Sequence, residues 1–345
     1  MLNRMEIRII LVGLGFMGGM HAQSYALIPG ARIVAIVDFD LARARQQAAK
    51  LHLAVPTHAT LAEALRSVPA DMVDICLPTD LHPAAALEAI AAGKAVFCEK
   101  PLALTVKDAD EIAAAATLKG VSLQVGQCIR FWPEYQALVE FVRANRAGRL
   151  LSLNLTRRSG RPTASAGNWL MDPKRSLGAL LDLHIHDTDF VHHLLGNPHF
   201  VTTFGTKEAT GWSHVFTHYH FDGIAVHAEG GWNYPGAWGF QMAFQAVFEN
   251  GAVEYDSNAT PTLRATIGDH PPAPLPFLAP KAGSSIGGAG NISSLGGYYN
   301  ELAYFIACLR RGEMPRIATG DQAARSVRTV LAELESAETG RTIAL

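Results

Sequence analysis

The chain has 345 residues and a formal net charge of −2, and no more than two lysine or arginine residues stand next to each other. This length exceeds what one ordinary hydrophobic core holds, so we expect two domains. The nearly balanced charge disfavours nucleic acid and anionic membrane surfaces as partners.

The first apolar run, Ile9–Met20, follows Arg4 and Arg8 and therefore resembles a secretory signal. Four of its twelve residues are glycine, which disfavours a helix, and the run is too short to span a bilayer. The four cysteines are widely spaced and form no C-x-x-C pair, as is typical of reduced thiols. We expect a cytoplasmic protein.

Residues 7–125 alternate between short apolar runs and amphipathic or alanine-rich stretches. The runs predict strands at 7–12, 32–37, 72–77, 95–98 and 121–125, and the stretches between them predict helices at 16–28, 40–51, 80–92 and 105–119. Apolar strands that alternate with helices are typical of a parallel sheet covered on both faces. We therefore predict a doubly wound α/β domain over residues 1–125.

The pattern changes after residue 126. A helix is predicted at 133–146, followed by strands at 151–156, 214–221, 224–229 and 240–248. These elements predict an α+β domain over residues 126–345 with a large, mostly antiparallel open sheet. The segment 267–297 is dense in proline, glycine and serine, so we expect a mobile loop or a lid there. Two predicted helices, at 298–311 and 319–338, close the chain.

A glycine-rich motif, G-L-G-F-M-G at 13–18, lies between the first predicted strand and the first predicted helix. Gly13 permits the tight turn, Gly15 lets a pyrophosphate approach the backbone, and Gly18 allows the helix to pack closely on the strand. The phosphates then lie at a helix N-terminus, which favours anions. We predict a dinucleotide site here, with Phe16 and Met17 beside the cofactor.

Asp38 ends the second predicted strand, 20 residues beyond Gly18. A carboxylate there accepts hydrogen bonds from the adenosine ribose hydroxyls and repels a 2′-phosphate. The alternative is that Asp38 only caps the helix that starts near Asp40. Phe39 stands where an NADP enzyme often carries arginine, so we predict NAD rather than NADP. Arg43 leaves NADP open, because from the first turn of the helix it can reach a phosphate.

Lys100 follows the apolar run 95–98 and stands between Glu99 and Pro101. Open α/β sheets bind ligands outside the carboxyl ends of their strands, so we expect this lysine near the nicotinamide half of the cofactor. A primary amine there can exchange protons with a substrate hydroxyl. We predict that Glu99 and Lys100 line the cofactor site and that Lys100 is also catalytic.

Asp182 and His186 lie four residues apart. On one helix they would share a face, and a carboxylate one turn away can orient the imidazole ring and hold its charge. A metal site at the histidine pairs 184/186 and 192/193 is the alternative, but this spacing matches no common ligand set. We therefore predict that Asp182 and His186 are catalytic, and we predict no metal site.

Five motifs resemble those of the Gfo/Idh/MocA oxidoreductases, a family that includes inositol and sugar dehydrogenases. The most specific is A-G-K-A-V-F-C-E-K-P-L-A-L-T at 92–105. The others are V-G-L-G-F-M-G at 12–18, L-P-T-D-L-H at 77–82, R-F-W-P-E-Y at 130–135 and G-A-L-L-D-L-H-I-H-D-T-D at 178–189. The resemblance therefore covers nearly the whole chain.

This resemblance implies a catalytic triad of Lys100, Asp182 and His186 and a cis bond between Lys100 and Pro101. It also implies that Arg130 can face the substrate. The stretch that lies under the cofactor in the family matches Leu77, Pro78, Thr79 and His82. The chain departs from the family pattern at 176–178, where Ser-Leu-Gly replaces a glycine triplet, and at position 184, where histidine replaces glycine. Both departures can reshape the pocket.

The expected reaction transfers a hydride between a sugar or polyol hydroxyl carbon and C4 of the nicotinamide. His186 takes the hydroxyl proton, Asp182 orients the imidazolium, and Lys100 hydrogen-bonds the same oxygen. Trp169 and Arg130 are further candidates for substrate contact, with packing at the domain interface as their alternative role.

Three other functions stay open: a glycosidase that keeps NAD bound, a non-catalytic NAD-sensing regulator, and an imine or biliverdin-type reductase. We expect a homodimer or homotetramer that forms through the sheet of the second domain, as in relatives. The segment 214–248 holds more aromatic residues than one sheet face needs for its own core. These residues are Phe216, Tyr219, Phe221, Trp232, Trp238, Phe240, Phe244 and Phe248.

Overall fold

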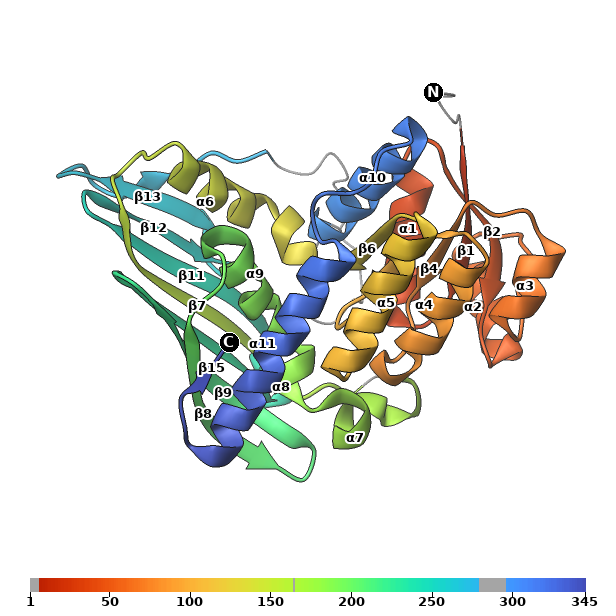
Figure 1. The fold of residues 1–345 in the computed structure, drawn as a ribbon. Coiled ribbons are helices and arrows are strands. Elements are labelled where there is room, and N and C mark those ends of the chain that lie inside the picture. The colour runs from red at the N-terminus through yellow and green to blue at the C-terminus, as the bar shows by residue number, and fades with distance from the viewer. Residues whose placement is uncertain (1–5, 164, 279–295) are drawn as a thin grey trace.

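The computed structural model describes residues 6–163, 165–278 and 296–345, and it contains two sheets that lie side by side (Figure 1). The N-terminal part of the chain builds a six-stranded sheet, and the part that follows builds a nine-stranded sheet. Among the described residues, no helix is both long and apolar enough to cross a bilayer. The predicted α/β class is confirmed.

The six-stranded sheet contains β1 (Ile7–Val12), β2 (Ala31–Val37), β3 (Thr57–His58), β4 (Met72–Ile75), β5 (Ala95–Glu99) and β6 (Leu123–Gly126). Its strands are parallel and lie in the order β3-β2-β1-β4-β5-β6. The order reverses between β1 and β4, and sheets of this kind bind ligands at the carboxyl ends of the strands at such a reversal. This is the doubly wound sheet that the sequence predicts.

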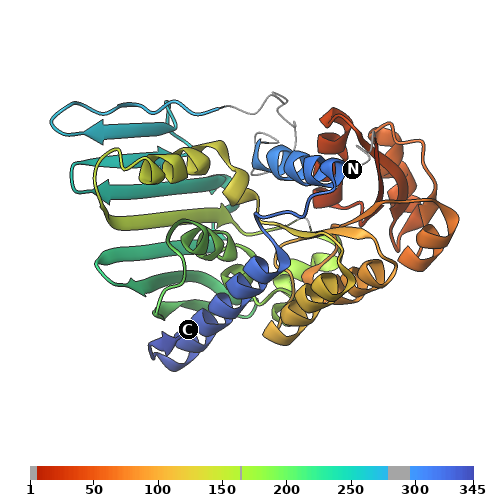
Figure 2. The same ribbon diagram turned by 45° about the horizontal axis from the view of Figure 1, so that its top comes forward.

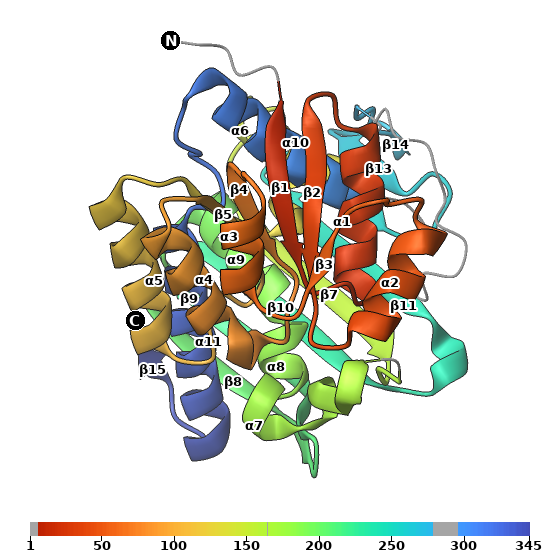
Figure 3. The same cartoon turned by 90° about the vertical axis from the view of Figure 1, so that its right-hand side faces the viewer.

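Helices cover both faces of this sheet, as Figure 3 shows on either side of β1 and β2. One face carries α1 (Phe16–Leu27), α2 (Leu41–Lys50) and α10 (Gly296–Arg311). The other carries α3 (Leu61–Ser67), α4 (His82–Ala91) and α5 (Val106–Lys119). The central strands are buried on both sides, which explains why they read as continuous apolar runs.

The nine-stranded sheet has the order β14-β13-β12-β11-β7-β10-β9-β8-β15. All neighbours pair antiparallel except β7 and β10, so the mostly antiparallel sheet is confirmed. The strands are β7 (Leu150–Gly160), β8 (Phe200–Glu208), β9 (Gly211–Phe221), β10 (Ile224–Tyr234), β11 (Phe240–Phe248), β12 (Gly251–Asp256), β13 (Leu263–Ile267), β14 (Ala273–Pro274) and β15 (Ile343–Ala344).

The helices α6 (Pro133–Arg143), α9 (Ile185–Leu195) and α11 (Gly320–Thr339) lie on one face of the large sheet (Figure 2). Side chains of the strands that point toward these helices are buried, and those on the opposite face are partly exposed. Four of the aromatic residues expected at an oligomer interface belong to this core instead, and less than 5% of each is exposed. They are Tyr219, Trp232, Phe244 and Phe248.

Two C-terminal helices return to the N-terminal sheet. The rings of Phe305 on α10 and Phe97 on β5 lie 6.0 Å apart, and α11 packs against α5. Both helices were predicted at nearly these bounds. The segment 267–297 contains β14 in its described part, whereas residues 279–295 of this predicted loop lie outside the described residues.

Candidate active site

The glycine loop is shaped by close approaches that exclude side chains at its two ends. A Cβ on Gly13, whose φ is +88°, would lie 2.5 Å from the Cys76 carbonyl oxygen, and one on Gly18 would lie 2.0 Å from the Gly13 carbonyl oxygen. Gly15, by contrast, has no atom within 4 Å of an added Cβ, and as N-cap it gives α1 no side-chain partner. The free N–H groups and the open space fit the pyrophosphate of NAD.

Phe16 and Met17 begin α1 directly after this loop. The Phe16 side chain is 51% exposed although it is large and apolar, and Met17 is half-buried. Both side chains therefore lie at the accessible start of the helix, where the sequence predicts the cofactor.

Asp38 lies at the carboxyl end of β2 and accepts a hydrogen bond from the Leu14 backbone N–H at 2.9 Å. The Arg43 guanidinium binds the same carboxylate, with Nη2 at 2.8 and 2.7 Å from the two oxygens. The N-cap of α2 is Asp40, which accepts from the Arg43 N–H, so the capping alternative for Asp38 is wrong. Asp38 and the glycine loop form one unit, as a ribose-binding carboxylate requires.

Lys100 follows β5, and its ammonium group reaches across to the second domain. Nζ donates to the Asp182 carbonyl oxygen at 2.7 Å and lies 3.1 Å from Asp182 Oδ1. Each of these side chains keeps a small exposed fraction, 14% and 18%. The Lys100–Pro101 bond is cis, as the resemblance implies. The structure thus brings two of the three predicted catalytic residues into direct contact.

Asp182 and His186 do not share one helix, contrary to the expectation from their spacing. Asp182 ends α8 (Ala179–Asp182) and His186 belongs to α9, with the chain turning between them. In the described part of the chain no hydrogen bond joins the Asp182 carboxylate to the His186 ring. The carboxylate is oriented by Lys100 instead.

His186 is only 9% exposed, and its Nδ1 atom is buried without a hydrogen-bond partner among the described residues. Burial, together with the positive charges of Lys100 and Arg157, lowers the pKa of the ring well below its ordinary value of 6.5. The ring is therefore neutral at physiological pH, which is the form that can accept a proton.

The sequence predicts that residues 77–82, which follow β4, contact the cofactor, but the structure gives His82 a different role. Its ring is fully buried and lies 2.8 Å from both the Pro101 and the Leu77 carbonyl oxygens. His82 therefore ties this loop to the turn that carries Lys100. Thr79 is also buried, whereas Leu77 and Pro78 are half-buried.

Arg130 is not available to a substrate, because its side chain is buried and each of its three nitrogens already donates a hydrogen bond. Nε and Nη2 bind the Asp189 carboxylate at 2.6 and 2.8 Å, and Nη1 binds Gln322. The alternative role in packing between elements fits this geometry. Trp169, in a 3₁₀ segment after β7, is partly exposed and keeps both of its expected roles.

The two departures from the family pattern lie in different surroundings. Leu177 and Gly178 both have positive φ angles, and a Cβ on Gly178 would lie 2.7 Å from the Trp212 carbonyl oxygen. His184 is fully buried against the large sheet, where Nε2 lies 3.1 Å from Thr217 Oγ1 and 3.3 Å from a Glu333 oxygen. His184 therefore belongs to the core and does not reshape the pocket directly.

A buried polar cluster behind Lys100 escaped the sequence analysis. His21 on α1 lies between two carboxylates, with Nδ1 2.8 Å from Asp74 and Nε2 3.0 Å from Glu99. The other Glu99 oxygen accepts from the Lys100 N–H at 3.2 Å. Glu301 on α10 is fully buried beside this group, and neither of its carboxyl oxygens has a hydrogen-bond partner among the described residues. Glu99 therefore supports the Lys100–Pro101 turn from its buried side.

Two groups within this cluster have a composition that could hold a metal ion, His21/Asp74/Cys76 and His21/Glu99/Glu301. Both ring nitrogens of His21 already face carboxylates at hydrogen-bonding distance. The Asp74 charge raises the pKa of His21 well above its ordinary value, although burial opposes this. In an imidazolium both ring nitrogens carry a proton, so neither has a lone pair that can bind a metal. We therefore assign no metal site to these two groups.

In addition to the pair of Lys100 and Asp182, another ion pair joins the loop after β4 to the second domain. Arg175, in α7 (Pro173–Ser176), binds both oxygens of Asp80 at 2.8 and 3.0 Å. Asp80 belongs to the loop after β4 that holds Leu77 and Pro78. The pair connects the expected cofactor side to the expected substrate side.

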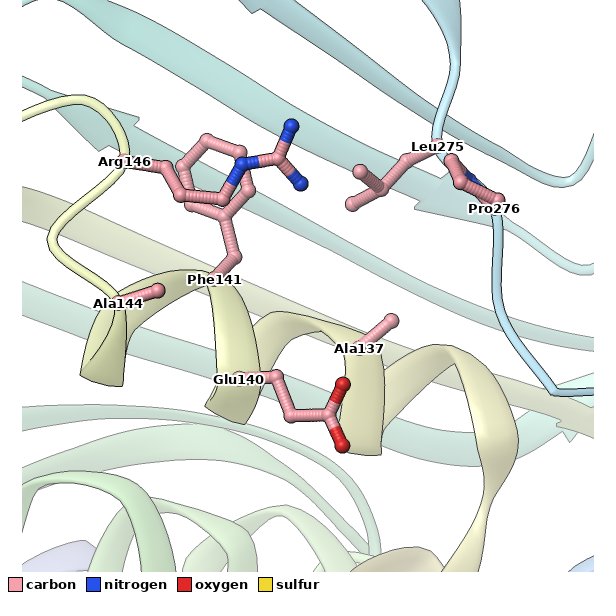
Figure 4. A pocket seen from close by; sticks show the side chains of 7 residues that line it. All are labelled: Ala137, Glu140, Phe141, Ala144, Arg146, Leu275 and Pro276. Carbon is pink, nitrogen blue, oxygen red and sulfur yellow. The ribbon is translucent and has the colours of Figure 1, made fainter.

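A surface hollow of about 200 Å³ lies elsewhere, between α6 and the segment after β14 (Figure 4). Glu140, Phe141 and Arg146 line it from one side and Leu275 from the other. None of these residues comes from an element that carries Lys100, Asp182 or His186, and we assign it no role.

Comparison with known proteins identifies both parts of the chain. Residues 7–127 match the model of an oxidoreductase family with an NAD-binding Rossmann fold. Residues 135–254 match the model of the GFO/IDH/MocA C-terminal domain.

Several curated relatives are named inositol 2-dehydrogenase. That of Pseudarthrobacter chlorophenolicus is 31% identical over 273 residues, which are 75% of this chain and 76% of the relative. That of Rhizobium meliloti is 37% identical over 198 residues, or 56% of each chain. The chain spans about half the length of several of the curated relatives it matches.

A solved structure with the same fold is an oxidoreductase from Agrobacterium radiobacter in complex with NAD+, L-tartaric acid and magnesium. It superposes with a TM-score of 0.86 over 98% of both chains at 20% identity, a similarity that shows the fold alone. The matches to both domain models and to the longer relative establish that this chain belongs to the Gfo/Idh/MocA oxidoreductase family, with an NAD-binding Rossmann domain at its N-terminal end.

Proposed function

We propose that this protein is an NAD-dependent dehydrogenase that oxidises a hydroxyl carbon of a sugar or an inositol-like polyol. The observation that carries the proposal is the contact of Lys100 with Asp182 next to a neutral His186, at the carboxyl end of β5. The names of the curated relatives, which include inositol 2-dehydrogenases, support the same substrate class.

In this proposal, bound NAD supplies the nicotinamide carbon that accepts the hydride. The Lys100 ammonium donates a hydrogen bond to the reacting oxygen and stabilises the negative charge that develops there. His186 accepts the hydroxyl proton, and we assign it to Nε2 because Nδ1 is enclosed by protein. Asp182 holds Lys100 in place and offsets its charge.

The loop and the cluster behind the site position these groups. Glu99 accepts the Lys100 N–H, and His82 joins the neighbouring turn to the loop after β4. Both contacts restrict the conformation of the Lys100–Pro101 turn. A preorganised ammonium group stabilises charge without having to move during the reaction.

The substitution Lys100→Met tests this proposal. Methionine preserves most of the apolar stem but removes the charged donor, so kcat should fall by about a hundredfold or more. The Kd for NADH should change little, because the glycine loop and Asp38 hold the other end of the cofactor. Rates of NADH formation with a panel of polyols and aldoses, together with NADH binding, measure both quantities.

Lys107→Met is the matched control, because Lys107 is exposed on α5. A Lys100→Met enzyme that keeps most of its turnover would overturn the assignment of Lys100. If the native protein forms no free NADH yet cleaves glycosides with NAD bound, the proposed net oxidation is wrong.

We also propose that two copies pair through the open face of the large sheet, opposite α6, α9 and α11. Large apolar side chains are exposed on this side, including Phe200 at 45%, Phe204 at 60% and Val247 at 42%. Exposed apolar area of this kind is typical of an association surface.

We also propose that the protein is cytoplasmic, because its four free cysteines fit a reducing environment.

A further inference from the structure

Arg43 covers the carboxylate that is expected to bind the adenosine ribose. The Asp38 side chain is only 2% exposed, whereas the Arg43 side chain that lies over it is 29% exposed. Nη2 is 2.8 Å from Oδ1 and 2.7 Å from Oδ2, so one nitrogen spans both oxygens. A ribose can therefore reach Asp38 only where the guanidinium now lies.

All the acceptor positions of this carboxylate are filled. Oδ1 accepts from the Asp40 N–H at 3.0 Å as well as from Arg43, and Oδ2 accepts from the Leu14 N–H as well as from Arg43. A carboxylate offers about four lone-pair positions. The two ribose hydroxyls must therefore replace the Arg43 contacts, since the backbone contacts belong to the fold.

The guanidinium also keeps one donor that can bind a ligand. Arginine carries five N–H groups, and Arg43 uses Nη2 for Asp38 and one N–H of Nη1 for the Leu14 carbonyl oxygen at 3.1 Å. Of the two remaining N–H groups, that of Nε faces Asp40 Oδ2 at 3.9 Å. The second N–H of Nη1 makes no hydrogen bond with the described residues, and the nearby Phe39 ring, 6.0 Å from the guanidinium carbon, is 80% exposed. A phosphate on the ribose 2′-oxygen can accept a hydrogen bond from this N–H while Asp38 stays paired.

We propose that Arg43 sets the cofactor preference by acting in opposite directions on the two cofactors. It competes with the ribose hydroxyls of NAD for Asp38, which weakens NAD binding. It also neutralises Asp38 and donates to the 2′-phosphate of NADP, which permits NADP binding. The inference rests on the use of a nicotinamide cofactor but on no particular substrate.

The test measures NADH and NADPH binding by fluorescence in the absence of substrate. In Arg43→Gln, the Kd for NADH should fall by about twofold to fivefold, the range expected for losing a partly exposed ion-pair competitor. The Kd for NADPH should rise by about tenfold or more, because a charge-assisted contact to phosphate is lost. Arg43→Lys keeps the charge without the spanning geometry, so NADPH binding should survive better than in Arg43→Gln.

Arg45→Gln is the matched control. It removes the same charge from the same helix, but Arg45 points to Thr57 Oγ1 at 3.1 Å and touches neither Asp38 nor the glycine loop. Its Kd values should match those of the native protein. A rise in the NADH Kd of Arg43→Gln, or an unchanged ratio of the two Kd values, would overturn the proposal. These binding results stand even if no sugar or polyol proves to be oxidised, so failure of the proposed function is separately visible.

Discussion

At the scale of single residues, burial decides which candidate side chains are free to act. Lys100 and Asp182 keep small exposed fractions, whereas the buried Arg130 guanidinium donates hydrogen bonds to Asp189 and Gln322. The His82 ring is also buried, and each of its nitrogens lies at hydrogen-bonding distance from a backbone carbonyl oxygen. Residue type and position along the chain made all four look similar, but only the first pair lies where a ligand can reach it.

The environment of His186 predicts an unusual pH dependence. Because burial and two nearby cations lower its pKa well below 6.5, the ring stays unprotonated as the pH falls from neutral to 6.5. A general base works only in the unprotonated form, so the acid limb of the kcat profile should lie below pH 6.5. Rates measured against pH in the oxidation direction test this.

The control for this experiment is His199→Gln, since His199 is exposed on the surface. That variant should reproduce the native profile. His186→Gln should lose about a hundredfold or more in kcat. An acid limb centred at or above 6.5 would show that another group titrates or that the ring is solvated in the working enzyme.

At the scale of elements, helix α10 buries Glu301 against the N-terminal sheet, where its carboxyl oxygens have no hydrogen-bond partner among the described residues. Burial, and then the nearby charge of Glu99, raise the pKa of Glu301 well above its ordinary value of 4.5. In the unfolded chain Glu301 ionises above that value, whereas in the folded protein it keeps its proton. Stability is therefore lost as the pH rises above 4.5 toward the folded pKa.

The substitution Glu301→Gln removes this dependence, because glutamine cannot ionise in either state. The difference in Tm between the variant and the native protein should shift in favour of the variant as the pH is raised. Thermal unfolding at a mildly acidic and an alkaline pH measures it, with Glu335→Gln on the exposed side of α11 as control. A difference that is the same at both values would mean that Glu301 is ionised in the fold.

The sequence predicted most elements, but it missed helix α3 and strands β3, β8, β12 and β13, among others. The long helices and apolar parallel strands were predicted within a few residues, because burial on one or both faces leaves a clear period. Helix α3 has seven residues and β3 has two, too few for a period to emerge. Strand β8 was missed because Phe200 and Phe204 point to the open face of the sheet. Its apolar and polar residues therefore do not alternate as in a strand with one buried and one exposed side.

The candidate site was predicted less completely than the fold. Motifs identified Lys100, Asp182 and Asp38, but contacts between distant segments, such as His21 with Asp74 and Glu99, arise only on folding. The available signal was an aspartate inside the apolar strand Met72–Ile75, since an acid in a buried strand needs a partner. That the Asp182 carboxylate faces Lys100 rather than His186 depends on the chain turn after α8, which spacing alone did not reveal.

At the scale of the whole molecule, the open sheet face predicts a defined assembly. Phe204 is stacked on Phe216 at 5.3 Å between ring centroids and is 60% exposed in the single chain. A charge there would be buried unpaired on association, so Phe204→Glu should yield monomers where the native protein sediments as a dimer or tetramer. Sedimentation at micromolar concentration compares the two.

Leu118→Glu provides the control, because Leu118 is 88% exposed on α5, away from the large sheet. It should leave the native assembly intact. A native protein that sediments as a monomer would refute pairing through the sheet, and a Phe204→Glu protein that still assembles would place the contact on another surface.

The return of α10 to the N-terminal sheet has a consequence for how the protein is made. The ribosome releases β1 to β6 first, yet the face formed by Ile9, Leu11 and Phe97 is covered by Leu302 and Phe305 from near the other end of the chain. Until that helix emerges, the nascent dinucleotide domain exposes an apolar surface to the cell. The sheet is therefore synthesised well before the helix that covers it. A chaperone that shields this face would act before α10 has been translated.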